Sequence, residues 1–193
     1  MRALTRRGAD LPCEIVRGDA LDSATYAGAV RGCDSFVHLV GVSHPAPWKE
    51  AQFRAVDLVS VREAVKAATQ AGIAHFVYVS VAHPAPAMKS YIRVRMECEG
   101  MIRASGLNAT ILRPWYVLGP GHQWPNALRP LYWIAEQIPA TRDGALRLGL
   151  VTIEQMRAAL VRSLEYPAAG LRVWHVPEIR SASSTVESAY ARP

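Results

Sequence analysis

The stretch from His75 to Gly121, HFVYVSVAHPAPAMKSYIRVRMECEGMIRASGLNATILRPWYVLGPG, decides the fold. Its first apolar run, Phe76–Val79, is short and rich in β-forming residues, which predicts a buried strand. A loop over Ser80–Lys89 follows, and then a helix on which Tyr91 and Arg95, four residues apart, share one face. A second apolar strand and a loop complete the stretch. The order strand, loop, helix, strand predicts a parallel α/β architecture.

Composition narrows the class of protein. The chain has 193 residues, 50% of them hydrophobic, which suffices for one domain with a sizeable core. No stretch approaches the ~18 apolar residues of a membrane span, and the N-terminus lacks the apolar core of a signal peptide. The formal net charge is +6, but the arginines are spread along the chain, which argues against a nucleic-acid partner. The three cysteines have no metal-ligand spacing; we interpret them as free thiols in a cytoplasmic, reducing compartment and predict no metal site.

Three further motifs make the pattern specific: Ser105-Gly106-Leu107, the strand end Thr110-Ile111-Leu112-Arg113-Pro114, and the turn Gly119-Pro120-Gly121. Together with Tyr91-x-x-x-Arg95 they resemble the short-chain dehydrogenase/reductase superfamily, and most closely its atypical, NmrA-like NAD(P)H-binding branch. The resemblance implies an α/β fold with a Rossmann-like, three-layer parallel sheet over residues 1–178. The polar segment 179–193 is expected to be a disordered tail.

One unit of the family pattern is not found in the sequence. The pattern begins with a strand, a glycine-rich turn that binds pyrophosphate, and a helix. Near the start of this sequence only Gly8 and Gly18 occur, so we expect a fold missing the first βα unit. The strand predicted over Ser35–Val40 would then have an unpaired edge. Two explanations stay open: a start codon upstream, which we favour, or a shortened paralogue that pairs with a partner.

The resemblance also places a cofactor, NADP or NAD. Arg6 and Arg7 follow the first expected strand, where the adenosine ribose would lie, and a guanidinium binds phosphate bidentately. They favour NADP(H), although a solvated basic N-terminus explains the same charges. The other expected cofactor contacts are Asp19, Leu39, Val40, Gly41, Arg95, Pro114 and Trp115.

Catalysis rests on Tyr91, which the resemblance makes the general acid or base for hydride transfer. A free tyrosine titrates near ~10 and needs a neighbouring cation to act at neutral pH. The family's lysine is replaced here by Arg95, a planar fork and not a point charge. Ser80 is the hydroxyl nearest to the family's catalytic serine, whose position is taken by Val81 or Ala82. Whether the chain is an enzyme is therefore left open.

Three functions remain. The first is an NADP-dependent oxidoreductase or epimerase relative acting on an unknown small molecule, with Trp115, Tyr116, Trp124 and Trp133 on an apolar substrate side or in the core. The second is a non-catalytic nucleotide-sensing, regulatory or complex-assembly protein, similar to NmrA-type regulators or to the related accessory subunit of respiratory complex I. The third is a non-binding interaction module. A homo-oligomer or another protein partner at the exposed sheet edge fits the last two.

The remaining elements are assigned by periodicity. Helices are predicted over Ser23–Val30, over Trp48–Ala71 with Gly72 as terminator, near Leu128–Ile138, and over Thr152–Leu164; a last strand is predicted over Arg172–Val176.

Overall fold

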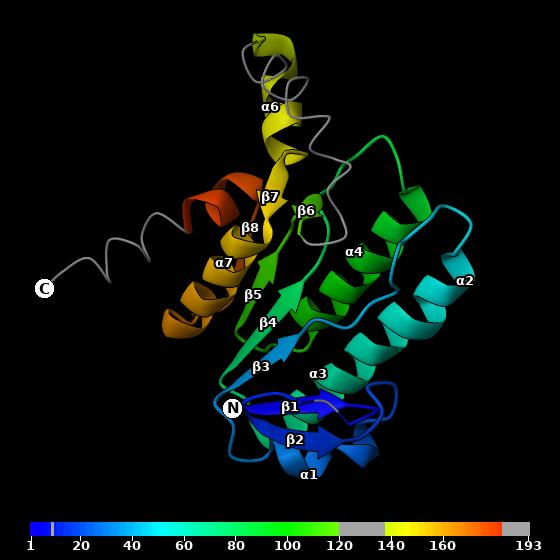
Figure 1. The fold of residues 1–193 in the computed structure, drawn as a ribbon, viewed down its shortest axis with the longest axis vertical. Helices are drawn as coiled ribbons and strands as arrows, with labels where there is room; N and C mark the ends of the chain where they lie inside the picture. The colour runs from blue at the N-terminus through cyan, green and yellow to red at the C-terminus, as the bar shows by residue number, and fades with distance from the viewer. Residues whose placement is uncertain (9, 120–137, 183–193) are drawn as a thin grey trace, which may run out of the picture.

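A four-stranded parallel sheet forms the centre of the computed structural model, which describes residues 1–8, 10–119 and 138–182 (Figure 1). Its strands lie in the order β3–β4–β5–β8, and all neighbouring pairs are parallel. The strands are β3 (Ser35–His38), β4 (His75–Val79), β5 (Ala109–Leu112) and β8 (Leu171–Trp174).

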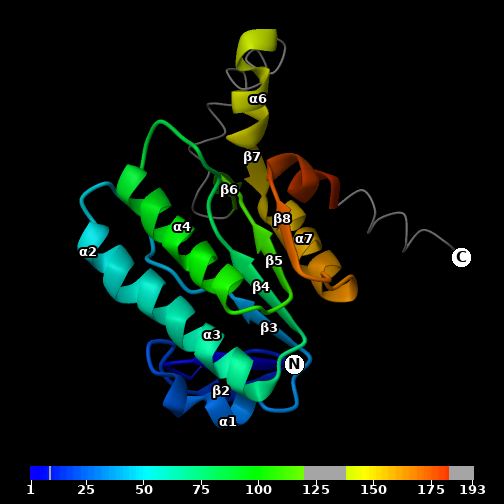
Figure 2. The same cartoon turned by 180° about the vertical axis from the view of Figure 1, so that it is seen from behind.

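Helices cover both faces of this sheet (Figures 1 and 2). On one face lie α4 (Lys89–Ala104) and a long helix made of α2 (Glu50–Gln52), the π-helical turn η2 (Phe53–Leu58) and α3 (Val59–Ala71). On the other face lies α7 (Ile153–Glu165), which begins with a capping box between Thr152 and Gln155. The predicted three-layer, Rossmann-like architecture is confirmed.

The two covered faces explain why β4 and β5 read as continuous apolar runs. Phe76 on β4 and Ile102 on α4 are fully buried in the larger core cluster. Removing side chains of this size from water contributes about 2 kcal/mol each. The long helix ends as predicted at Gly72, whose φ of 68° is the left-handed conformation that glycine adopts at no steric cost.

Two smaller sheets flank the central one. β1 (Arg2–Thr5) pairs in parallel with β2 (Glu14–Arg17), and this pair packs beside the short helices η1 (Ser23–Thr25) and α1 (Ala27–Val30). β6 (Tyr116–Leu118) pairs with β7 (Leu150–Thr152), next to α6 (Pro139–Arg147).

β1 and β3 are not paired with each other by backbone hydrogen bonds. Within the described residues these two strands belong to separate sheets, with β1 lying between β2 and β3 (Figure 1). Three of the four β3 residues are only half-buried, whereas the first four of β4 are buried. The edge expected at the Ser35–Val40 strand is thus present, although the strand itself ends at His38.

The structure differs from the sequence predictions in two further places. α6 was not predicted, because its PATRDGALR sequence holds a proline, a glycine and no apolar stripe. The chain is also helical over 176–182, where Ile179 and Ala182 are buried in the core, so this helix crosses the predicted boundary at residue 178. Residues 128–137 of a predicted helix, with Trp124 and Trp133, lie outside the described residues. None of the helices described is long and apolar enough to cross a membrane.

Candidate functional site

A pocket of about 320 Å³ lies where β1, β2 and β3 end. It is lined by Leu4, Arg6, Gly18, Asp19, Ala20, Leu21, Val40 and Val56. Three predicted cofactor contacts, Arg6, Asp19 and Val40, therefore meet in one place. The pocket forms because the carboxyl ends of parallel strands open at the same edge, which is where ligands bind in α/β sheets of this kind.

Arg6 and Asp19 form an ion pair across this pocket. Arg6 Nη2 donates to Asp19 Oδ2 at 3.0 Å and to Oδ1 at 3.1 Å. The backbone N–H of Leu21 also donates to Asp19 Oδ1, at 3.0 Å, and together with Arg6 it holds the pKa of this carboxyl below its usual value. The Arg6 side chain is 65% exposed, so its fork can still reach a ligand.

The other predicted contacts near this pocket lie outside its lining. Arg7 is exposed, and Leu39 is 62% exposed at the end of β3. Gly41 lies further along the same loop and is exposed, but the side chain that it lacks would point inward. A Cβ built on Gly41 would overlap the Nη2 of Arg95 and lie 3.1 Å from Asp57 Oδ1.

Arg95 is buried in a polar cluster under that loop. Its Nη2 lies 2.7 Å from Asp57 Oδ1, and its Nη1 donates to the Tyr78 hydroxyl and to the Val79 carbonyl, each at 3.0 Å. Both side chains of the Asp57–Arg95 pair are almost fully buried. Burial raises the pKa of Asp57, and the charge of Arg95 opposes the rise.

Tyr91 lies against this cluster. The Arg95 Cζ stands 5.0 Å from the centre of the Tyr91 ring, and the Phe53 ring packs on Tyr91 with centroids 4.9 Å apart. Burial raises the pKa of Tyr91, and the Arg95 charge offsets this only in part. The cation predicted to lower the tyrosine pKa is thus already engaged by Asp57.

Ser80 belongs to a second buried network. Its hydroxyl donates to Glu99 Oε1 at 2.6 Å, and Glu99 is held by both Arg113 Nε, at 3.0 Å, and Arg113 Nη2. His83 Nε2 lies 3.5 Å from the same carboxylate oxygen. Burial acts to raise the pKa of Glu99, but Arg113 and Ser80 outweigh it and hold the pKa low. Tyr91 therefore contacts Arg95, whereas Ser80 contacts Glu99. Arg95 and Glu99 lie one turn apart on α4.

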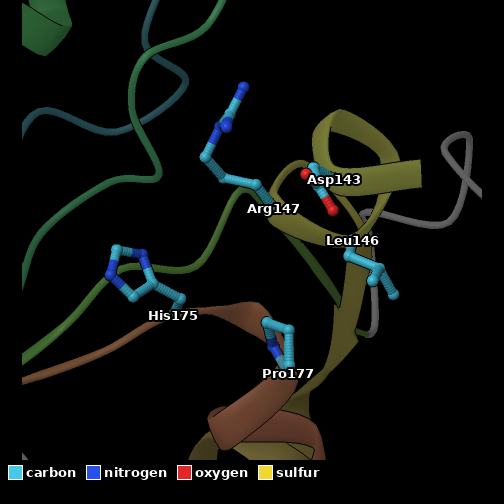
Figure 3. A pocket seen from close by; sticks show the side chains of 5 residues that line it. All are labelled: Asp143, Leu146, Arg147, His175 and Pro177. Carbon is cyan, nitrogen blue, oxygen red and sulfur yellow. The ribbon is translucent and has the colours of Figure 1, made fainter. Parts of the chain in front are cut away.

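The last predicted contacts follow β5. Pro114 is buried, and its carbonyl accepts from the Ala82 N–H at 2.8 Å; Trp115 is half-buried against Tyr116, with ring centroids 5.5 Å apart. A second pocket, of about 240 Å³, opens beyond β8 and α6 and is lined by Asp143, Leu146, Arg147, His175 and Pro177 (Figure 3).

Sequence reasoning missed Asp57. The long helix was predicted from apolar periodicity alone, whereas the structure buries the charged Asp57 and leaves the apolar Val56 at the pocket. The signal was present, because Asp57 lies four residues after Phe53 and three before Ser60, on the same face. An acidic residue at a buried helical position indicates a partner of opposite charge.

The sequence matches the NAD(P)H-binding family over residues 2–123, which is more than half of the chain. The chain belongs to the NAD(P)H-binding family. One curated relative is the uncharacterized sugar epimerase YhfK of Bacillus subtilis strain 168, 33% identical over 94 residues. That match covers 46% of this chain and 43% of the relative, so it spans less than half of the relative's length.

Solved structures match this NAD(P)H-binding chain over its whole length. A short-chain dehydrogenase/reductase superfamily protein from Agrobacterium tumefaciens with bound NAD aligns at a TM-score of 0.66 and 18% identity, covering 100% of this chain and 76% of that one. The enzyme WbmH of Bordetella bronchiseptica, in complex with NAD+, aligns at a TM-score of 0.65 and 20% identity, covering 100% and 73%. The predicted NAD(P)H-binding family, Rossmann-like fold and NAD(P) cofactor class are confirmed.

The described residues suit the adenosine end of such a cofactor. Arg6 offers an exposed guanidinium fork, and Asp19 is held in its ionised form as an acceptor. Val40 and Val56 supply apolar walls to the same pocket. This combination of apolar walls with a few convergent polar groups is typical of small-molecule and cofactor sites.

Proposed function

We propose that this chain binds NADP(H), with the 2′-phosphate of the adenosine ribose on Arg6 and Arg7. The observation that carries the proposal is the pocket in which Arg6, Asp19 and Val40 meet at the ends of three parallel strands. Leu39, Gly41, Pro114 and Trp115 would border the rest of the dinucleotide.

The charges around this pocket favour NADP(H) over NAD(H) only modestly. A 2′-phosphate gains bidentate hydrogen bonds from Arg6 and a second cation in the exposed Arg7. It also meets the Asp19 carboxylate, which already engages Arg6. With one charge opposing two, we expect a preference of about tenfold, equivalent to about 1.4 kcal/mol.

A fluorescence titration with NADPH and NADH tests this proposal. NADPH should bind about ten times more tightly, and Arg6→Ala should remove most of the preference while leaving NADH affinity nearly unchanged. Arg157→Ala, at an exposed arginine on α7, is the matched control and should change neither affinity. A folded chain that binds neither nucleotide would overturn the proposal.

The second proposal concerns chemistry. The bound cofactor would supply a hydride donor or acceptor at its nicotinamide, and a small-molecule substrate would then face Tyr91 and Ser80. Of the two classes, non-catalytic nucleotide binding is favoured over oxidoreductase or epimerase turnover, because Asp57 occupies the cation that would lower the pKa of Tyr91. NADPH binding without oxidation in the presence of a panel of carbonyl compounds and nucleotide sugars would support this choice; steady oxidation that Tyr91→Phe abolishes would reverse it.

The third proposal concerns setting and partners. The three cysteines are free, which supports a cytoplasmic, reducing compartment. The separate edges of β1 and β3 support a homo-oligomer or a protein partner that contributes a strand between them.

A further inference from the structure

The Asp57 carboxylate connects the loop after β3 to α4. Its Oδ2 accepts from the backbone N–H of Val42 at 3.2 Å, on the loop after β3. Its Oδ1 lies 2.7 Å from Arg95 Nη2, on α4. The Asp57 side chain is fully buried, so both contacts are shielded from solvent.

The backbone around Asp57 is unusual. Asp57 lies within the π-helical turn η2, which interrupts the long helix over Phe53–Leu58. Such turns are rare and occur frequently at functional sites. The residue before Asp57, Val56, lines the pocket at the strand ends, while Asp57 itself points inward to the loop and to Arg95.

The backbone of the loop from Leu39 to Val42 packs against the Asp57–Arg95 ion pair. At Gly41 an added Cβ would overlap the Arg95 guanidinium, so the main chain passes directly against the pair. The residue before Gly41, Val40, lines the pocket, and the residue after it, Val42, donates to Asp57. A shift of the carboxylate or of the guanidinium would therefore move the pocket wall.

We propose that Asp57 is a positioning residue: together with Arg95 it fixes the loop from Leu39 to Val42 and thereby sets the affinity for the dinucleotide, without contacting the dinucleotide itself. This inference rests on the proposed binding of NADP(H). In this inference Arg95 supports the loop, whereas the lysine at this position in the family acts directly on the tyrosine and the cofactor.

The test compares Asp57→Asn with the wild-type chain. The variant keeps the shape of the side chain but removes the charge that holds Arg95. We expect NADPH affinity to fall at least tenfold and the Val42 amide to exchange with solvent at least tenfold faster. Gly41→Ala, which crowds the same pair from the loop side, should weaken NADPH binding in the same direction.

Two further variants separate positioning from general destabilisation. Glu99→Gln breaks a second buried carboxylate–arginine pair, that with Arg113, and should leave NADPH affinity and Val42 exchange unchanged. If Asp57→Asn does not fold, the double variant Asp57→Asn with Arg95→Met removes both buried charges together and leaves no unpaired one. That double variant should fold and still bind NADPH at least tenfold more weakly.

The outcomes are distinguishable. A wild-type chain that binds NADPH, with an Asp57→Asn or double variant that binds it equally well, overturns this inference and leaves the proposed function intact. Unchanged Val42 exchange in a folded variant with weakened binding also overturns it, because the loop would not be the cause. A folded wild-type chain that binds no NADPH overturns both.

Discussion

At position 95 the chemistry of a single side chain decides what its neighbours can do. A lysine there would present one ammonium on a flexible stem, whereas the guanidinium spreads its donors over Asp57, Tyr78 and the Val79 carbonyl. Asp57 and Tyr78 are fully buried, so these contacts hold the charge inside the fold. Arg95 on α4 is therefore bound to η2 and to β4. Donors engaged in these contacts are not available to a tyrosine or to a ribose.

Replacing Arg95 measures this structural part. Arg95→Met leaves Asp57 buried without its cation, which should destabilise the fold by about 3–5 kcal/mol. Arg95→Lys keeps a charge near Asp57 but loses the hydrogen bonds to Tyr78 and Val79, so we expect a loss of about 1–2 kcal/mol. Urea denaturation gives both values. Equal losses in the two variants would show that charge at this position does not matter. If Tyr91 is catalytic, Arg95→Lys should also raise any weak reductase rate.

His38 makes stability depend on pH. Burial first, and the nearby charge of Arg95 second, hold its pKa at about 4, whereas in the unfolded chain it titrates near its usual value of 6.5. The unfolded state therefore binds more protons between these values, and stability falls as the pH drops from above 6.5 towards 4. The full effect is roughly 3 kcal/mol. His75 and His83, whose pKa values are also lowered, act in the same direction.

Urea denaturation at pH 7.5 and pH 5.5 measures the His38 contribution. The wild-type chain should be less stable at pH 5.5, and His38→Gln, which cannot take up a proton, should lose clearly less between the two values. His75 and His83 contribute to the remaining pH dependence. The same loss in both proteins would show that His38 does not carry the effect.

At the scale of elements, predictability follows from periodicity. The central strands and the long helix have strong apolar patterns, and their bounds could be predicted from the sequence to within a few residues. α6 carries no such pattern, and its position depends on contacts such as the one between Arg147 Nε and the Pro84 carbonyl, 63 residues away. The site divides in the same way. The family resemblance placed Arg6, Asp19 and Val40 at the ends of expected strands, whereas finding Asp57 required knowing which helical face meets α4.

The capping box of α7 gives a prediction for one element. Thr152 Oγ1 accepts from the Gln155 N–H at 3.2 Å, and the Gln155 side chain accepts from the Thr152 N–H at 2.9 Å. Thr152→Ala removes one of these bonds and should cost about 1 kcal/mol, which lowers the melting temperature by a few degrees. NADPH affinity should not change, because α7 covers the opposite face of the sheet from α4. Arg157→Ala on the same helix is the control for surface truncation.

At the scale of the whole molecule, the break between β1 and β3 divides the sheet that carries the pocket. The pocket draws its walls from both sides of this break, with Leu4 in β1, Arg6 just after β1, and Val40 after β3. Packing through the shared core holds the two sides together, since Leu4 and Phe36 contact the same cluster of buried residues. A strand supplied between them would add hydrogen bonds to both edges.

Hydrogen exchange can show whether these edges are free in solution. In a parallel sheet successive residues direct their backbone groups to opposite neighbours, so about half of the β3 amides point away from β4. We expect these outward amides, and the corresponding ones of β1, to exchange much faster than the amides of β4, which pairs on both sides. In dilute solution, where sedimentation gives the mass of one chain, strong protection of both outward sets would contradict the separation of the two sheets. If a second copy pairs at these edges, protection of both sets should instead rise with protein concentration, in step with the dimer mass.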